Sequence, residues 1–167
     1  LDVFKAVSLQ KLPTGNRLMI LTNAGGPGVL ATDFLVRSGG KLAELSSASR
    51  EDLSKFLPEF WSHANPVDIL GDADKGRYAQ ALDTLLKDSD SDALLVLLTP
   101  QAMPQCTETA AILAEKAKSC AKPVFAAWMG EGRVAKARKL MLQSGIPNYE
   151  SPEEAIDTFL SLAQAGN

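Results

Sequence analysis

Hydrophobic residues along the chain fall into short continuous runs that alternate with longer segments of helical period. The runs cover about residues 17–23, 41–45, 92–98, 123–128 and 146–149, and we expect each to form a strand. Segments of helical period lie between and after them, over about residues 27–38, 50–57, 75–87, 107–119, 132–144 and 152–163. This alternation is typical of a parallel sheet covered by helices on both faces.

The number and order of these elements predict a fold of the α/β class. We expect a flavodoxin-like doubly wound parallel sheet of strand order 2-1-3-4-5 inside a three-layer α/β/α arrangement, over residues 15–165. Residues 1–14 read as a short linker helix from an upstream domain. In such a sheet the ligand crevice lies outside the carboxyl ends of strands 1 and 3, where the winding reverses. Ser49 and Ser151 are the expected caps of the helices that follow them.

The first strand leads into a glycine-rich segment, LTNAGGPGVLATDFL, residues 21–35. Such a turn lets unpaired N–H groups approach an anion, and the helix dipole favours negative charge there. Gly25, Gly26 and Gly28 would form this cradle, while Asn23 either shapes the turn or faces the anion. Its candidate ligands are a dinucleotide pyrophosphate and a single phosphoryl group, and the third possibility is a tight turn without a ligand. The G-x-G-x-x-A match of residues 26–31 is out of register with the strand, which disfavours the dinucleotide.

Composition narrows the classes of partner. With 167 residues, 46% of them hydrophobic and 22% charged, the chain suits one globular domain. A net charge of −3 and no clustered run of Lys and Arg argue against nucleic acid and against a membrane surface as partners. The sequence shows no signal peptide, no long apolar span and no metal-ligand spacing, so we expect a cytoplasmic protein with no metal of its own.

A second polar motif, HANPVDILG, covers residues 63–71. Asn65 precedes a proline and Asp68 follows three positions later, which is the chemistry of a rigid polar turn, so we expect both to support that turn. His63 is the only histidine, and the stiff Asn65-Pro66 backbone beside it indicates a surface or turn role. Thr99 and Gln101, after the third strand, are the next polar groups expected at the crevice.

Six segments together carry a family resemblance. They are GNRLMILTNAGGPGVLATDFL, GGKLAELS, NPVDILGDAD, DALLVLLTPQAM, KPVFAAWMGEG and GIPNYESPEEAIDTF. They resemble the flavodoxin-like ligase domain of NDP-forming (ADP-forming) acyl-CoA synthetases, relatives of succinyl-CoA synthetase, from about Gly15 to Leu162. In that superfamily acyl-CoA, NDP and phosphate yield the acid, CoA and NTP through a phosphorylated histidine on a mobile loop. The N-termini of two glycine-preceded helices stabilise the phosphohistidine.

The resemblance implies a division of labour between this chain and other parts of an acid–thiol ligase. It places one of the two helix starts at residues 23–33, so the expected phosphate-binding residues are Asn23, Gly25, Gly26, Gly28 and Val29, with no catalytic residue in this chain. A CoA-binding domain, the phosphohistidine loop and an ATP-grasp domain are expected elsewhere in the parent synthetase, which would use CoA, ADP or ATP, and Mg. This domain alone would bind none of these cofactors and would be inactive.

Two other functions remain open at this stage. The segments LDVFKAVSLQKLPTGNRLMI and GGKLAELS are also similar to the regulatory synthetase-like region of bacterial GNAT-type protein lysine acetyltransferases. A non-catalytic module that responds to a nucleotide or CoA is the other possibility. The intact NAGGPG motif favours a working phosphate site. On that interpretation, valine at position 28 would impair phosphoryl transfer more than stability.

Overall fold

A computed structural model describes residues 11–100, 105–130 and 132–166. Most of the expected linker helix and Gln101 lie outside these ranges, and residues 11–14 form no helix. The strands are β1 (Arg17–Thr22), β2 (Lys41–Leu42), β3 (Val67–Asp68), β4 (Ala93–Leu98) and β5 (Val124–Trp128). The helices are α2 (Gly25–Arg37), α3 (Ser47–Ser54), α4 (Lys75–Lys87), α5 (Cys106–Ala117), α6 (Ala135–Gln143) and α7 (Pro152–Ala165).

The strands form one parallel sheet of five strands. Its path runs β2-β1-β4-β5, and β3 joins it by pairing with β1. Because β2 pairs with the start of β1 and β3 with its end, these two short strands share one side of β1. β4 lies on the other side of β1 and is buried along its whole length. This order agrees with the expected flavodoxin-like topology.

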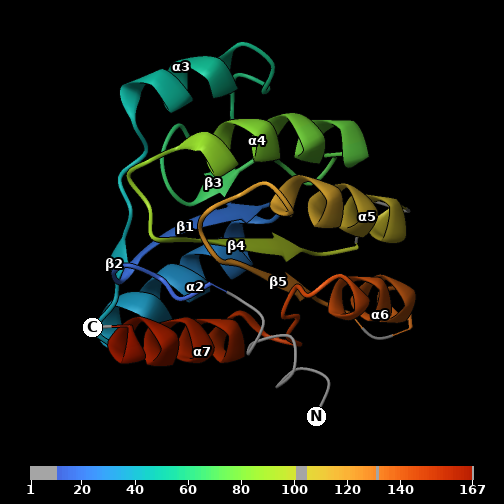
Figure 1. The fold of residues 1–167 in the computed structure, drawn as a ribbon. Helices are drawn as coiled ribbons and strands as arrows, with labels where there is room; N and C mark the ends of the chain where they lie inside the picture. The colour runs from blue at the N-terminus through green and yellow to red at the C-terminus, as the bar shows by residue number, and fades with distance from the viewer. Residues whose placement is uncertain (1–10, 101–104, 131, 167) are drawn as a thin grey trace.

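Helices cover both faces of the sheet (Figure 1). α2 and α7 pack on one face, where Ala31, Leu35, Ile156 and Phe159 join the inward side chains of β1, β4 and β5. α3, α4, α5 and α6 pack on the other, around a larger cluster that includes Tyr78 and Trp128. Successive strand residues point to opposite faces, so the fully apolar strands supply both cores. The predicted three-layer arrangement is confirmed.

The strand predictions need three corrections. The expected strand at 41–45 ends at Leu42: the Ala43 N–H still donates to the Leu18 carbonyl, but the Ala43 carbonyl accepts from the Asn65 side chain and not from β1. The expected strand at 146–149 is only an isolated bridge between Ala126 and Asn148. Proline at position 147 has no N–H to donate to a longer ladder. The two-residue strand β3 was not predicted at all, because polar turn residues surround it.

Helix predictions were closer to the structure. α4 has the expected bounds, and Ser151 caps α7 by accepting from the Glu154 N–H. The expected cap at Ser49 was wrong: Ser46 caps α3 by accepting from the Ser49 N–H at 3.1 Å. α3 therefore begins at Ser47 and ends at Ser54 rather than Leu57.

Candidate functional site

The candidate site lies at the carboxyl edge of the sheet, between β1 and its two neighbours. β1 ends at Thr22, beside β3 on one side and β4 on the other. From there the chain turns at once into α2 on one face, whereas β3 leads towards α4 on the opposite face. This is the reversal of winding at which doubly wound sheets bind their ligands.

Asn23 holds this edge together rather than facing outward. Its side chain is buried, with Nδ2 donating to the Thr99 carbonyl at 2.8 Å and Oδ1 accepting from the Thr99 N–H at 2.9 Å. The Thr99 hydroxyl donates to the same Oδ1 at 3.2 Å. The amide thereby links the ends of β1 and β4 as one more rung of the ladder would. These hydrogen bonds are those of a residue that shapes the turn, which was one of the two roles considered for Asn23.

α2 starts at Gly25 without a side-chain cap. Its N-cap residue is Ala24, which makes no side-chain cap bond, and the first turn contains no acidic residue. α4, by contrast, is capped by Asp74, which accepts from the Arg77 N–H at 2.8 Å. The first N–H groups of a helix have no intrahelical partner, so those of Gly25 and Gly26 remain available to an external acceptor. Both glycines are exposed.

The other two predicted contacts, Gly28 and Val29, lie deeper in the helix. The Gly28 N–H donates to the Ala24 carbonyl at 3.4 Å, so it is already used within the first turn. Gly28 is buried, and a Cβ on it would lie 3.2 Å from Thr22 Cγ2 and 3.4 Å from Pro66 Cβ. Its lack of a side chain lets α2 pack closely on the HANPVD turn. Val29 exposes 61% of its surface.

Asp68 belongs to β3 and carries the nearest carboxylate to the start of α2. Its Oδ1 accepts from the Leu70 N–H at 2.9 Å, which holds a local turn in which Leu70 has φ 77°. Its own N–H donates to the Ser62 hydroxyl at 2.9 Å. The other oxygen, Oδ2, lies 3.3 Å from where a Cβ on Gly25 would stand. Asp68 thus makes hydrogen bonds within this turn, and its remaining oxygen lies next to the helix start.

Asn65 fills the gap in the sheet between β2 and β3. Its Oδ1 accepts from the Ile20 N–H at 3.0 Å, and its Nδ2 donates to the carbonyls of Leu18 at 2.9 Å and Ala43 at 2.8 Å. Leu18 and Ile20 belong to β1, whereas Ala43 directly follows β2. The hydrogen bonds of this side chain thus lie inside the sheet and not within the turn for which Asn65 was expected to act as a support.

Two residues near the site were not singled out by sequence reasoning. The Ser62 hydroxyl accepts from the Asp68 N–H and donates to the Pro66 carbonyl at 2.6 Å. It therefore bridges two backbone groups of the HANPVD turn. Tyr78, in α4, donates from its hydroxyl to the Leu97 carbonyl at 2.8 Å, and burial raises the pKa of this phenol well above its usual value. A lone Ser or Tyr gives no pattern from which these contacts could be inferred.

His63 lies outside this arrangement. Its side chain is exposed, its backbone φ is 58°, and its ring stacks on Trp61 with centroids 4.5 Å apart. Ring atom Nε2 lies 2.8 Å from the Glu59 carbonyl. The residue therefore has the turn role that the sequence predicted.

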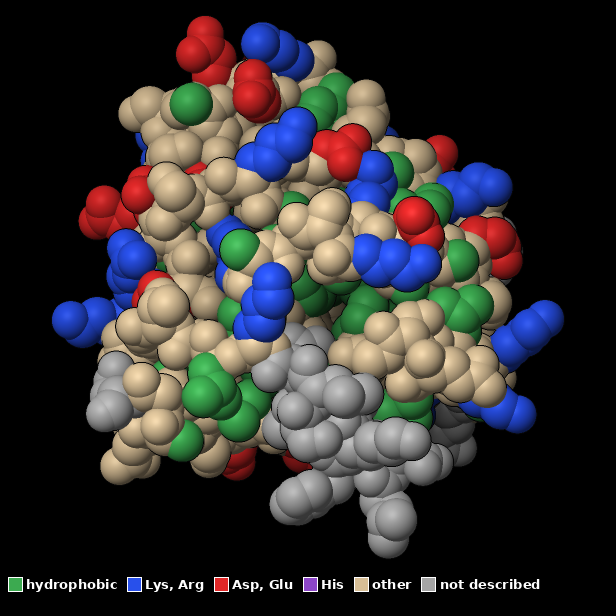
Figure 2. Space-filling model, in the orientation of Figure 1, with side chains coloured by type: hydrophobic (Ala, Val, Ile, Leu, Met, Phe, Trp, Pro, Cys, Tyr) green, Lys and Arg blue, Asp and Glu red, His purple; other side chains and the backbone are tan. Residues whose placement is uncertain are grey.

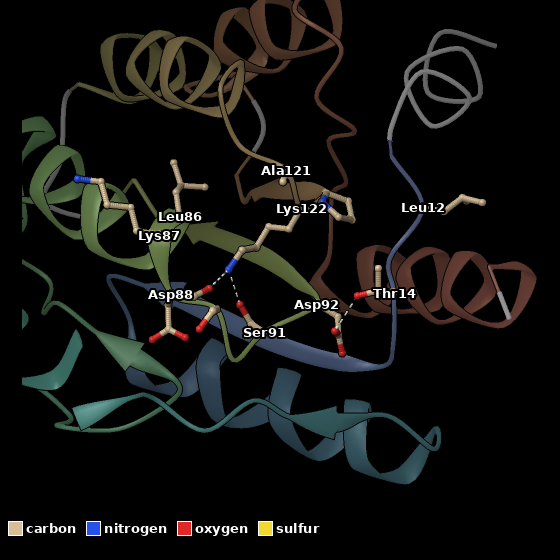
Figure 3. Close-up of a pocket in the computed structure, with 11 residues that line it drawn as sticks. Leu12, Thr14, Leu86, Lys87, Asp88, Ser91, Asp92, Ala121 and Lys122 are labelled. Atoms are coloured by element: carbon tan, nitrogen blue, oxygen red, sulfur yellow. Dashed lines mark hydrogen bonds between the residues drawn. The ribbon is translucent and has the colours of Figure 1, made fainter. Parts of the chain in front are cut away.

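A cavity of about 310 Å³ lies at the opposite edge, where β4 and β5 begin (Figure 3). Lys122 points into it, and its ammonium donates to the Asp88 carbonyl and, at 2.7 Å, to the Ser91 hydroxyl. Burial lowers the pKa of Lys122. Asp92 in turn accepts from Thr14 and from Arg17. Since Lys122 and Asp92 already have hydrogen-bond partners within the chain, this cavity is a weaker candidate for a ligand site than the start of α2.

Surface charge and possible metal ligands do not point to a further site among the described residues. On the face shown in Figure 2, Lys and Arg side chains are interspersed with Asp and Glu side chains. Among the described residues, no group of three or more His, Cys, Asp and Glu side chains is placed to hold a metal ion. In the same part of the chain, no helix is long and apolar enough to cross a membrane.

Comparison with known proteins places this geometry in context. The family model described as the ligase-CoA domain matches residues 18–162. The alpha subunit of an ADP-forming acetate–CoA ligase II from Pyrococcus furiosus is 38% identical over 159 residues, which are 93% of this chain and 35% of that protein. An ADP-forming 4-hydroxybutyrate–CoA ligase from Nitrosopumilus maritimus is 32% identical over 96% of this chain and 23% of its own length.

A solved structure agrees in fold as well as in sequence. It is an acetyl-coenzyme A synthetase 1 from Candidatus Korarchaeum cryptofilum, in complex with phosphate and ADP, and it superposes with a TM-score of 0.87 at 33% identity. The match covers 99% of this chain and 36% of that one. The chain therefore spans about a quarter to a third of the length of these relatives.

Proposed function

From the premise that this chain belongs to the ligase-CoA domain family, we propose that it is one domain of an NDP-forming acyl-CoA synthetase and binds a transferred phosphoryl group at the start of α2. The relatives reported above are ADP-forming CoA ligases, and one solved relative contains phosphate and ADP. Those names favour a working ligase over the regulatory region of an acetyltransferase or a non-catalytic module.

The uncapped start of α2 is the observation that carries the proposal. Gly25 and Gly26 offer two N–H groups at the positive end of a helix of 13 residues, at the winding reversal of the sheet. A phosphoryl group gains charge-assisted hydrogen bonds there, each worth about 1.5–3 kcal/mol. Asn23 supports this site by joining the ends of β1 and β4, and Asn65 by hydrogen bonding to β1 further from its end.

The rest of the reaction would take place on other domains or subunits of the synthetase. The phosphoryl group would arrive on a histidine carried by one of them, since His63 lies in an exposed turn. CoA, the nucleotide and Mg would be held by a CoA-binding domain and an ATP-grasp domain, with synthesis taking place in the cytoplasm. The domain within 15–165 would then act by orienting and stabilising charge, not by supplying a nucleophile.

Gly26→Ala in the assembled synthetase tests the proposal. Among the described residues, and apart from its chain neighbours and the backbone of its own helix, no atom lies within 4 Å of a Cβ built on Gly26. The fold therefore has room for the methyl group, whereas an approaching anion loses that space. We expect transfer of labelled phosphate from ATP to the enzyme to slow about ten- to a hundredfold, with an unchanged melting temperature. Gly76→Ala is the matched control, because Gly76 is the second residue of α4 as Gly26 is of α2. Equal phosphorylation rates in the two variants would overturn the proposal.

A further inference from the structure

α2 exposes apolar side chains on the turn that follows its two free N–H groups. Val29 and Leu30 each expose 61% of their surface, whereas Gly28, Ala31 and Leu35 are buried against the sheet. The outer side of a surface helix is ordinarily polar. With a rise of 1.5 Å per residue, the two side chains stand about 6 Å along the axis from the glycine N–H groups. Val29 and Leu30 therefore lie about one helical turn from a group bound at those N–H groups.

We propose that Val29 and Leu30 form a docking surface for the segment of the synthetase that delivers the phosphoryl group. This inference rests on the proposed function and names the contact by which the group would be held in place. Two apolar side chains next to a helix N-terminus suit a partner segment that carries one anion between apolar residues. Val29, predicted from sequence as a phosphate contact, would then act through its side chain instead of its N–H.

The distribution of charge supports this occupant over a second copy of the chain. The first turn of α2 has no acidic residue, and its next exposed charge is Asp33, beyond Leu30. Two copies meeting symmetrically through this surface would bring two positive helix ends together, which is unfavourable. An incoming phosphoryl group instead meets opposite partial charge. The Asp68 carboxylate, whose Oδ2 lies 3.3 Å from where a Cβ on Gly25 would stand, has the same sign of charge as the phosphoryl group.

The relatives are much longer than this chain, so the rest of their length could supply such a partner segment. This chain corresponds to 35% of the P. furiosus subunit and to 23% of the N. maritimus ligase. The surface is also continuous with the proposed phosphate contact, so a single segment can occupy both.

Leu30→Ser in the assembled synthetase is the test, read as the rate at which ATP phosphorylates the enzyme. Loss of one buried leucine contact should slow this step about tenfold or more. Val29→Ser gives an independent second variant, and Leu30→Met, which keeps the apolar surface, should restore the rate. Val36→Ser is the matched control: Val36 lies in the same helix, is 58% exposed, and stands about 10 Å further from the N-terminus. It should phosphorylate at the wild-type rate.

Several outcomes would overturn the docking surface. One is a wild-type rate in both Leu30→Ser and Val29→Ser while Gly26→Ala is slow, which leaves the proposed function standing. Equal slowing by Val36→Ser would indicate a general effect on the helix. If Leu30→Ser instead separates a dimer of this chain without slowing phosphorylation, the occupant is a second copy. Normal rates in all variants, Gly26→Ala included, would overturn both proposals.

Discussion

The side-chain amide of Asn23 and the backbone of Thr99 form a reciprocal pair of hydrogen bonds, 2.8 and 2.9 Å long, that joins the ends of β1 and β4. Neither strand reaches the other here through its own backbone pairing, which stops at Leu21 and Val96. On the side of β4, the turn into α2 is therefore held in position by one side chain. A change at Asn23 should be felt first as a loss of stability.

Asn23→Asp should lower the free energy of unfolding by about 3 kcal/mol, because the carboxylate cannot donate to the Thr99 carbonyl and sets a charge against it in a buried place. Thr99→Val is the control: it removes only the hydroxyl bond of 3.2 Å and should cost about 1 kcal/mol. Urea denaturation of both variants measures the difference. Similar costs would show that the amide donor is unimportant.

Asn65→Ala should be among the most damaging single changes outside the hydrophobic core. It leaves the Ile20 N–H and the Ala43 carbonyl without this partner, whereas the Leu18 carbonyl still accepts from the Ala43 N–H. At about 1–2 kcal/mol for each of the two groups left unpaired, we expect a loss of about 2–4 kcal/mol in urea denaturation. Asn16→Ala is the comparison, since its exposed amide makes a single bond of 3.2 Å to the Gly39 carbonyl. A loss no greater than that of Asn16→Ala would contradict the sheet-filling role.

The contrast between Asn23 and Asn65 shows what the sequence could and could not predict. Continuous apolar runs such as residues 92–98 located the strands, since a strand buried on both faces has no other composition. The glycine-rich segment located the turn into α2, because glycine and proline mark the boundaries between elements. The partners of Asn23 and Asn65, however, lie 76 and up to 47 residues away along the chain. No local sequence pattern encodes such pairings. The short strand β3, which follows Asn65 and Pro66, could not be predicted from a local pattern either.

The packing around Gly28 disagrees with the sequence-based expectation for a substitution at this position. Gly28→Ala should destabilise the chain by about 1–3 kcal/mol, because its methyl group would press on Thr22 and Pro66 at 3.2 and 3.4 Å. Valine would cost more, so the expected selective effect of Gly28→Val on phosphoryl transfer gives way to a loss of fold. Gly26→Ala, with room for its methyl group among the described residues, is the control and should melt at or slightly above the wild-type temperature. Differential scanning calorimetry of the pair decides between the two roles.

Protonation of Asp92 should measurably lower the free energy of unfolding at acid pH. Burial alone would raise the pKa of its carboxyl, but hydrogen bonds from the Arg17 side chain and N–H and from Thr14 outweigh burial and hold the pKa below its ordinary value. A depressed carboxyl pKa stabilises the fold above the pKa of the unfolded chain, about 4, and this contribution is lost as the pH falls through the folded pKa.

Urea denaturation between pH 6 and pH 2 should therefore show stability falling below about pH 4, with a shallower fall in Asp92→Asn. Arg17→Met should lie between the two, because the Arg17 N–H and the Thr14 hydroxyl still reach the carboxylate at 2.9 and 3.1 Å. Parallel curves for the wild type and Asp92→Asn would mean that other carboxylates govern the acid limb.

Asp68 provides the most direct probe of the charge at the start of α2. Its Oδ2 faces Gly25, and its Oδ1 holds the Leu70 N–H at 2.9 Å. Asp68→Asn keeps an oxygen for Leu70, so the turn should persist, while the negative charge next to an incoming phosphate disappears. At about 5 Å in water that repulsion amounts to roughly 1 kcal/mol, so the affinity for inorganic phosphate should rise about fivefold. The shifts of the Gly25 and Gly26 amide signals during a phosphate titration measure this affinity.

Asp33→Asn is the control: it removes an equal charge further along the same helix and should change the affinity much less. Should both variants respond alike, phosphate is sensing only net charge; should Asp68→Asn weaken phosphate binding, the carboxylate would be helping to hold the ligand, and its place beside Gly25 would need that explanation instead.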